Sequence, residues 1–389
     1  MTPELNERLT RVGKGTPAGE LLRRYWMPVA PSAELTTAAP KKRIRVLGED
    51  LVLFRDGQGR PGLVEEQCPH RSASLYYGFV EDDGLRCAYH GWKFDCAGRC
   101  VDQPFEPENG RLKDKVQAQA YPLQEFCGLI FAYLGPLPAP LLPDWDILRR
   151  EDGDRLIDML PVLNCNWLQI MENSVDPSHT YYLHAHTLAT KGRAERGAYY
   201  YRPIKNLNFE VVKTPTWGGV IKQRVYGGDQ AEEERGHPVI FPNMLLSPQR
   251  QHLVMHIRTP IDDTHTRIFR VQFTPNDNGR PQPQPAEVPV RYQDSFRNED
   301  GEYHLDTFAS QDAMAWETQG QVTDRERETL GSSDRGIVMY RRLLREQIDA
   351  LAEGKEPIGV IRDPALNNRI KIEVSTGQAR MAKMAEAAG

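Results

Sequence analysis

The sequence predicts an α+β fold with two domains: a small antiparallel β domain, then a larger domain of the helix-grip type, in which an antiparallel sheet wraps around helices. Short strand-like segments separated by turn residues run through 42–134. A proline-rich stretch at 136–143 follows and is typical of a stiff linker. Beyond it, long strand-like segments precede the main helices, an order that favours α+β over alternating βαβ units. With 389 residues, the chain is long enough to bury two cores.

The β domain is expected at 38–142, after an N-terminal segment at 1–37 that packs on the domains. Residues 4–24 have partial helical character, interrupted by glycines and a proline between positions 13 and 19. The expected strands of the β domain are 44–46, 51–54, 63–67, 84–86 and 131–134.

The second domain is expected at 143–389. Residues 164–183 are compatible with helix, and 336–352 form the clearest amphipathic helix. The acidic run at 232–234 indicates a solvated loop, and the proline-rich run at 280–289 indicates an excursion or a disordered segment. The expected strands of this domain are 209–212, 219–226, 252–258 and 266–273.

Two cysteine–histidine pairs lie inside the β domain. Cys68 precedes His70, and after sixteen intervening residues Cys87 precedes His90. Thiolates suit iron–sulfur centres, and two histidines on one iron in place of two cysteines raise the cluster potential. A Cys₂His₂ zinc site is the alternative, although zinc fingers usually pair Cys with Cys and His with His. The arrangement resembles a Rieske [2Fe–2S] site, with the cysteines on one iron and the histidines on the other.

A second candidate metal site follows α-helical sequence in the larger domain. His179 and His184 supply two imidazoles, and Asp176 lies one helical turn before His179. Two histidines and one carboxylate are the ligand set of non-haem Fe(II) oxygenases. On a regular α-helix, residues five apart point about 140° apart. We therefore expect either a locally distorted helix or a metal beyond its end, and His186 remains an alternative ligand.

Together, the two motifs resemble the oxygenase (α) subunit of the Rieske non-haem iron aromatic-ring hydroxylases. The branch that contains phthalate dioxygenase and phenoxybenzoate dioxygenase is the most similar. Further stretches that support this resemblance are 11–17, 25–28, 311–317 and 333–338. No extra cysteine stands beside either pair to brace the loops with a disulfide, as in respiratory Rieske proteins, so the cluster resembles the lower-potential oxygenase type.

The resemblance implies roles for particular residues. It makes His179, His184 and Asp312 the iron ligands, with Asp312 chosen by its place after Gln311. Other nearby aspartates remain alternatives: Asp306, Asp324 and Asp334. Asp176 would bridge between His179 and the cluster ligand His90 of a neighbouring subunit. The alternative role for Asp176 is simply to start a helix before Pro177.

The resemblance also implies O₂, an aromatic carboxylate substrate and a homo-oligomer, either a trimer or a hexamer. No dinucleotide-binding glycine motif and no plant-type ferredoxin cysteine spacing is present in the chain. A separate NAD(P)H-dependent reductase with flavin and a ferredoxin-type cluster is therefore expected. Arginines grip carboxylates well, and four were considered without choosing among them: Arg202, Arg224, Arg250 and Arg258.

The expected reaction is cis-dihydroxylation. The main alternative is O-demethylation of methoxylated aromatic acids, and a pure electron carrier is a third hypothesis.

Composition excludes other classes of function. The net charge of −5 provides no basic face for nucleic acid, and no segment is apolar and long enough to span a membrane. Arg23-Arg24 is not followed by the apolar region of a twin-arginine signal, so a cytoplasmic location is expected. The four cysteines outside the cluster are expected to be free thiols. His252 and His256 lie in strand-like sequence and are expected to be structural.

Overall fold

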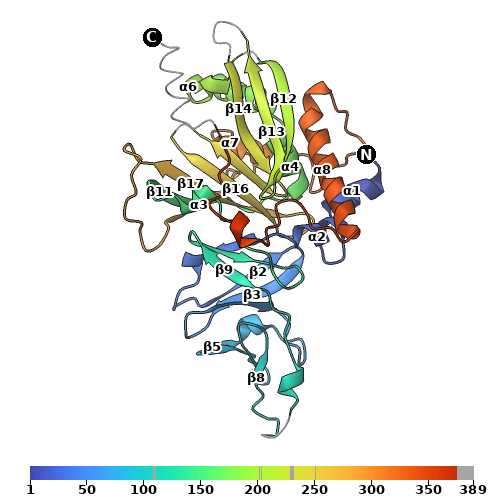
Figure 1. Ribbon diagram of the computed structural model, residues 1–389, viewed down its shortest axis with the longest axis vertical. Coiled ribbons are helices and arrows are strands. Elements are labelled where there is room, and N and C mark those ends of the chain that lie inside the picture. The colour runs from blue at the N-terminus through green and yellow to red at the C-terminus, as the bar shows by residue number, and fades with distance from the viewer. Residues whose placement is uncertain (108–110, 201, 203, 228–231, 250, 375–389) are drawn as a thin grey trace.

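Figure 1 shows the computed structural model as two lobes along its long axis, one with the small sheets and one with a large sheet and the main helices. The structure describes residues 1–389 except 108–110, 201, 203, 228–231, 250 and 375–389. Among the described helices, none is both long enough and apolar enough to cross a membrane.

The smaller lobe contains three antiparallel sheets, of which β2–β3–β4 and β5–β6–β7–β8 hold the loops with the Cys–His pairs. The third sheet, β1–β10–β9, takes its first strand from the N-terminal segment. The strands are β1 (Met27–Pro31), β2 (Lys41–Val46), β3 (Glu49–Arg55), β4 (Pro61–Glu65), β5 (Phe79–Glu81), β6 (Gly84–Arg86), β7 (Lys93–Phe94), β8 (Cys100–Asp102), β9 (Leu123–Phe126) and β10 (Leu129–Ala132).

The larger lobe is built on an eight-stranded sheet, antiparallel except where β11 meets β18. In sheet order, its strands are β12 (Ile204–Lys213), β13 (Gly218–Tyr226), β14 (Glu232–Ile240), β15 (Met244–Pro248), β16 (Leu253–Pro260), β17 (Thr266–Pro275), β11 (Gly153–Met159) and β18 (Val290–Tyr292).

Two long helices pack against this sheet, α4 (Trp167–Val175) and α8 (Arg335–Ala352), and α7 (Phe308–Glu317) packs against α4. The N-terminal helices α1 (Pro3–Thr10) and α2 (Pro17–Leu22) lie beside α8. The short α-helices are α3 (Asp146–Arg149), α5 (Thr187–Thr190) and α6 (Ala194–Gly197). The 3₁₀ turns are η1 (Ser32–Glu34), η2 (Leu75–Tyr77), η3 (Lys113–Lys115), η5 (Ala198–Tyr200), η7 (Ser332–Asp334) and η8 (Pro364–Leu366). One segment, η4 (Thr180–His186), is a π-helix.

The two faces of the large sheet bury different side chains because residues alternate along each strand. Val220 on β13 belongs to the core beneath α4 and α8, whereas Met255 on β16 belongs to the core on the opposite face. The face toward the helices also buries polar groups. Lys222 and Arg224 lie on the same face of β13 as Val220, and Arg258 lies on β16. Each of the three charged residues is at most 4% exposed. This face therefore carries buried positive charge.

The α+β prediction is confirmed, and the helix at 336–352 is confirmed as α8. One expectation was wrong. Residues 232–234 are not a loop. They begin β14, which pairs antiparallel with β13 so that Glu232 lies opposite Tyr226. The reason is tertiary: backbone hydrogen bonds to a neighbouring strand outweigh the low strand propensity of consecutive glutamates. The proline-rich run at 280–289 is an excursion as expected, held to residue 151 by a backbone hydrogen bond from Gln282.

Candidate functional site

The two Cys–His loops share one backbone pattern. In each loop, the cysteine N–H donates to the carbonyl five residues later, which belongs to Ala73 or Trp92. The cysteine carbonyl accepts from the N–H four residues later, and all four distances are 2.8–3.0 Å. The fourth residue has positive φ in both loops, +57° at Ser72 and +74° at Gly91. Cys68 and Cys87 therefore sit at equivalent positions in two matching turns.

The four side chains separate into a thiol pair and an imidazole pair. Cys68 and Cys87 are each 3% exposed, and burial, followed by the neighbouring Cys87, raises the pKa of the Cys68 thiol to about 11. The rings of His70 and His90 lie 4.5 Å apart between centroids and are partly exposed. The ring of Trp92 stacks on His70 at 4.2 Å.

This separation distinguishes a two-iron cluster from zinc. A zinc ion needs all its ligand atoms around one point. Within the described part of the chain, three or more potential ligand atoms come within 4.8 Å of one another only at His179, His184 and Asp312. A cluster with thiolates on one iron and imidazoles on the other fits the two separate pairs.

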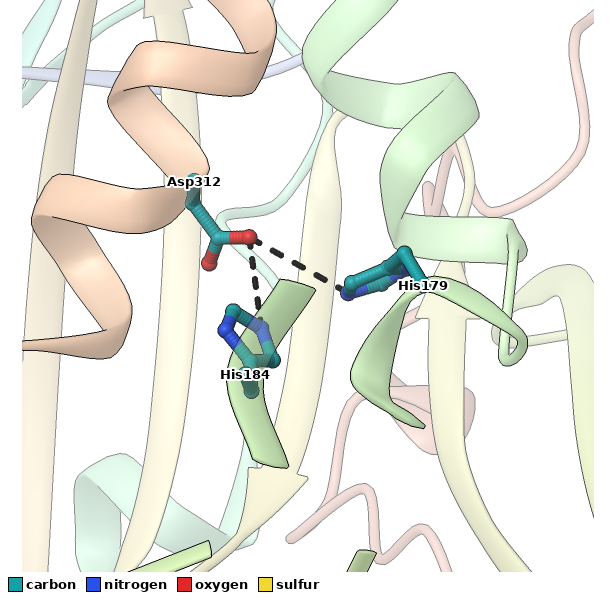
Figure 2. A group of neighbouring side chains, drawn as sticks. All are labelled: His179, His184 and Asp312. Atoms are coloured by element: carbon teal, nitrogen blue, oxygen red, sulfur yellow. Dashed lines mark ion pairs between the residues drawn. The ribbon is translucent and has the colours of Figure 1, made fainter. Parts of the chain in front are cut away.

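The second site lies where α4 ends and η4 begins (Figure 2). His179 precedes η4 and His184 lies within it. A π-helix forms i→i+5 hydrogen bonds, which bring residues five apart close to one face. Of the two expected alternatives, the locally distorted helix is present, and it brings together two imidazoles that a regular α-helix would separate.

Asp312 reaches the two histidines from α7, on the far side of the site (Figure 2). Its Oδ1 lies 3.4 Å from His184 Nε2 and 4.0 Å from His179 Nε2. Asp312 Oδ1 is buried and has no hydrogen-bond partner among the described residues. One unpaired carboxylate oxygen facing two imidazole nitrogens is a donor set that a single Fe(II) would satisfy.

Gln311 and Phe308 orient His184. The Nδ1 of His184 lies 2.8 Å from Gln311 Oε1, and Gln311 Nε2 donates to the carbonyl of Leu305 at 2.9 Å. The amide thus presents its oxygen to the ring, so Nδ1 carries the proton and Nε2 is free for a metal. Burial lowers the pKa of His184, although Asp312 opposes the shift, and Phe308 stacks on the ring at 4.5 Å. These supporting roles were not predicted; the position of Gln311 beside Asp312 was the available signal.

Asp176 has two roles at once. Its Oδ1 accepts hydrogen bonds from the backbone N–H and the hydroxyl of Ser178, both at 2.6 Å, and so starts the turn before η4. Its Oδ2 lies 3.4 Å from His179 Nδ1, a contact too poorly aligned to count as a hydrogen bond. Burial raises the pKa of Asp176, but His179 and Ser178 outweigh burial and lower it overall. The helix-start role is present alongside the contact with His179.

The alternative ligands do not join the site. His186 is exposed and lies outside the ligand group formed by described residues. Asp306 instead pairs with Lys191 and Arg193. The other aspartates and the two strand histidines are also outside that group: Asp324, Asp334, His252 and His256.

Of the four arginines considered, two lie on the sheet face toward the site. Arg224 Nε donates to the carbonyl of Pro177 at 3.0 Å, and Arg258 Nη2 donates to Ser174 Oγ at 2.9 Å. Arg202 lies over the ring of Tyr226 at 3.7 Å. Arg250 lies outside the described residues. All six cysteines are free.

Comparison with known proteins gives the class first. Residues 25–122 match the Rieske [2Fe–2S] domain, and residues 288–384 match the LigXa C-terminal domain like family. The caffeine complex of NdmA from Pseudomonas putida CBB5 has a TM-score of 0.64 at 21% identity and covers 86% of this chain and 93% of that one. An oxygenase–ferredoxin complex of carbazole 1,9a-dioxygenase has a TM-score of 0.65 at 20% identity, covering 96% and 99%. These likenesses show the fold.

Three relatives are similar over most of their length. The 5,5'-dehydrodivanillate O-demethylase oxygenase subunit of Sphingobium sp. (strain NBRC 103272 / SYK-6) is 40% identical, covering 96% of this chain and 86% of the relative. The phenoxybenzoate dioxygenase subunit alpha of Ectopseudomonas oleovorans is 38% identical, covering 91% and 87%. The phthalate 4,5-dioxygenase oxygenase subunit of Pseudomonas putida is 33% identical, covering 95% and 91%.

The chain therefore belongs to the oxygenase (α) subunits of the Rieske non-haem iron oxygenases. It is an oxidoreductase whose cofactors are a [2Fe–2S] Rieske cluster and a mononuclear iron. The relatives are named as oxygenase subunits, and the carbazole 1,9a-dioxygenase oxygenase was solved in complex with a ferredoxin.

Proposed function

We propose that this chain is the terminal oxygenase of a system that cis-dihydroxylates an aromatic carboxylate, using O₂ and electrons from NAD(P)H. The observation that carries the proposal is the meeting of His179, His184 and Asp312 from two separate helical segments. When bound there, iron supplies open coordination positions for O₂ activation.

The protein groups around this site have separate tasks in the proposal. Gln311 holds His184 in the tautomer that offers Nε2, and Asp176 holds His179 from the other side. Cys68 and Cys87 hold one iron of the cluster, while His70 and His90 hold the other and expose their edges for electron exchange.

We propose that electrons cross between copies of the chain. In Figure 1, the lobe with β5 and β8, which carries the cluster loops, lies at the far end of the molecule from α4 and α7. His90 of one copy would contact Asp176 of the next. Such a head-to-tail arrangement closes into a ring, here a trimer or a hexamer of stacked trimers. Mass photometry of an active monomer would rule this out.

The electron donor in this proposal is a reductase with flavin and a ferredoxin-type cluster, because the chain has no nucleotide-binding glycine motif of its own. Purified protein, such a reductase and NADH would be screened against aromatic mono- and dicarboxylates for oxygen uptake. Stoichiometric uptake with one acid supports the proposal, and uptake that never couples to any acid contradicts it.

O-demethylation of methoxylated aromatic acids is the second candidate, favoured by the relative that is an O-demethylase oxygenase subunit at 40% identity. The product decides between them: a cis-dihydrodiol supports dihydroxylation, whereas formaldehyde supports demethylation. Metal analysis tests the third hypothesis, because a pure electron carrier would hold two irons per chain rather than three.

A further inference from the structure

Lys222 is a nearly buried lysine whose amine has no polar partner among the described residues, and its Nζ is not one of the nitrogen atoms closed off from solvent. The residue is 4% exposed, and its Nζ makes no hydrogen bond or ion pair with any residue that the structure describes. A charge removed from water is costly unless it is paired. Burial, and then the nearby Arg224, lower the pKa of Lys222 to about 7, while Asp176 and Asp312 oppose the shift.

The position of Lys222 places it beside the iron site. It lies between Val220 and Arg224 on the face of β13 that meets the helices. Arg224 contacts the carbonyl of Pro177, so this face lies against the turn between Asp176 and His179. Charged groups from three neighbouring segments shift the pKa of Lys222: Asp176 after α4, Arg258 on β16 and Asp312 on α7.

A second buried cation shares this shortage of acceptors. Arg258 is 2% exposed and donates from Nη2 to Ser174, but its Nε and Nη1 have no partner among the described residues. The carboxylates of this region have other tasks: Asp176 bonds Ser178 and contacts His179, and Asp312 faces the histidines. A divalent iron would add further positive charge, which either the loss of the Lys222 proton or a bound anion would balance.

We infer that Lys222 receives the carboxylate of the aromatic substrate and so orients the ring relative to the iron. This inference rests on the proposed function, since it names the group that recognises the acid. Lysine suits this role because it is a compact point charge with three donors. The bound carboxylate would be the hydrogen-bond acceptor that no described residue offers to Lys222.

The test compares binding of acids and their neutral primary amides. The probes are phthalate, phenoxybenzoate and 5,5'-dehydrodivanillate, taken from the acids in the relatives' names, each titrated calorimetrically beside the amide in which every carboxylate is replaced. Wild-type protein should prefer at least one acid over its amide by about 10- to 100-fold, the size of one charge-assisted hydrogen bond. Lys222→Met should abolish this preference, and Lys222→Arg should restore part of it.

The matched control is Lys213→Met, since Lys213 is exposed on β12 and pairs with Glu346 at 3.1 Å. It should keep the full preference. Lys222→Met should also keep three irons per chain and should not melt earlier than wild type, because it removes a charge that the fold leaves unpaired. Lys222→Gln provides a second neutral variant should the methionine variant fail to fold.

Three results separate the possibilities. If Lys222→Met still prefers the acid over its amide, the inference is wrong. If wild type also couples oxygen uptake to the same acid, the proposed function is still supported. An earlier melting point for both neutral variants, with the preference intact, assigns Lys222 to the fold instead. Absence of both acid binding and acid-coupled oxygen uptake in wild type overturns the proposed function and the inference with it.

Discussion

At the scale of single residues, the iron site depends on side chains that hold ligands rather than on the ligands alone. Gln311 is fully buried and spans from His184 Nδ1 to the carbonyl of Leu305. Both ends of its amide are thereby used, and this fixes the direction in which the imidazole offers Nε2. Partners of this kind tune metal affinity by orienting the ligand.

Replacing Gln311 with leucine should weaken iron binding at this site by about 10- to 100-fold, because His184 loses the acceptor that selects its tautomer. Iron titration and the EPR spectrum of the ferrous–nitrosyl adduct would measure the change. Gln311→Glu keeps an acceptor and should retain most of the affinity. Gln319→Leu, at an exposed position just after α7, is the control. An unchanged spectrum in Gln311→Leu would contradict the orienting role.

Asp176 offers a second residue-scale prediction. Asp176→Asn keeps the shape but removes the charge that lies 3.4 Å from His179 Nδ1. We expect reduction of the cluster by the reductase to be unchanged, whereas its reoxidation during turnover slows by about 10- to 100-fold. Stopped-flow absorbance resolves the two phases. A variant in which both phases match wild type would exclude Asp176 from the electron path.

At the scale of elements, the π-helix η4 determines which histidine lies beside His179 in the candidate iron site. The i→i+5 pattern brings His184 to the face of His179 and leaves His186 exposed. His184→Ala should therefore reduce the iron content from three to two atoms per chain, and His186→Ala should leave three. Metal analysis by mass spectrometry provides the count, and the reverse pattern would transfer the ligand role to His186.

The contact between α8 and α4 positions the start of the site. A Cβ on Gly336 would lie 2.5 Å from the carbonyl oxygen of Val175, the last residue of α4, and that backbone cannot easily move. Gly336→Ala should lower the free energy of unfolding by about 1–3 kcal/mol. Urea denaturation measures this. Gly331→Ala, with no atom closer than 3.7 Å, should change little, and equal effects in both variants would remove the steric explanation.

At the scale of the whole molecule, one buried ion cluster joins segments far apart in sequence. Glu172 on α4 accepts from Arg325 at 2.7 and 2.9 Å and from Arg341 on α8 at 2.6 Å. Arg325 also donates to Asn6 of α1 at 2.9 Å, so the N-terminal segment is tied to the helix that leads into the iron site.

Removing the charge of Glu172 should destabilise the protein strongly, because it leaves two arginines without their shared partner. We expect Glu172→Gln to cost about 3–5 kcal/mol in the free energy of unfolding, measured by urea denaturation. Glu346→Gln, which breaks an exposed pair on α8, is the control and should cost less than about 1 kcal/mol. A comparable small loss for both would show that the cluster is dispensable.

Much of this molecule is determined by the sequence alone. The ligand types and spacings of Cys68, His70, Cys87 and His90 predict the cluster site, because each pair lies within one short loop whose turn sets its geometry. Periodicity, which depends only on neighbouring residues, predicts α8 and part of the strands: β2, β3, β4, β6, β10, β12, β13, β16 and β17.

Only the tertiary structure decides which distant groups meet. The resemblance selected Asp312, but only the packing of α7 against η4 shows that Asp312 and not Asp306 meets the histidines. The spacing of His179 and His184 left open whether the helix is distorted or the metal lies beyond its end, and the π-helix decides this. The strand at 232–240 likewise depends on its neighbour β13. In the sequence, Lys222 resembles an ordinary strand lysine, and only the fold shows that it is 4% exposed and has no acceptor among the described residues. The physical reason is common to all four: local preference is set by adjacent residues, whereas coordination, pairing and desolvation depend on contacts between segments far apart in the chain.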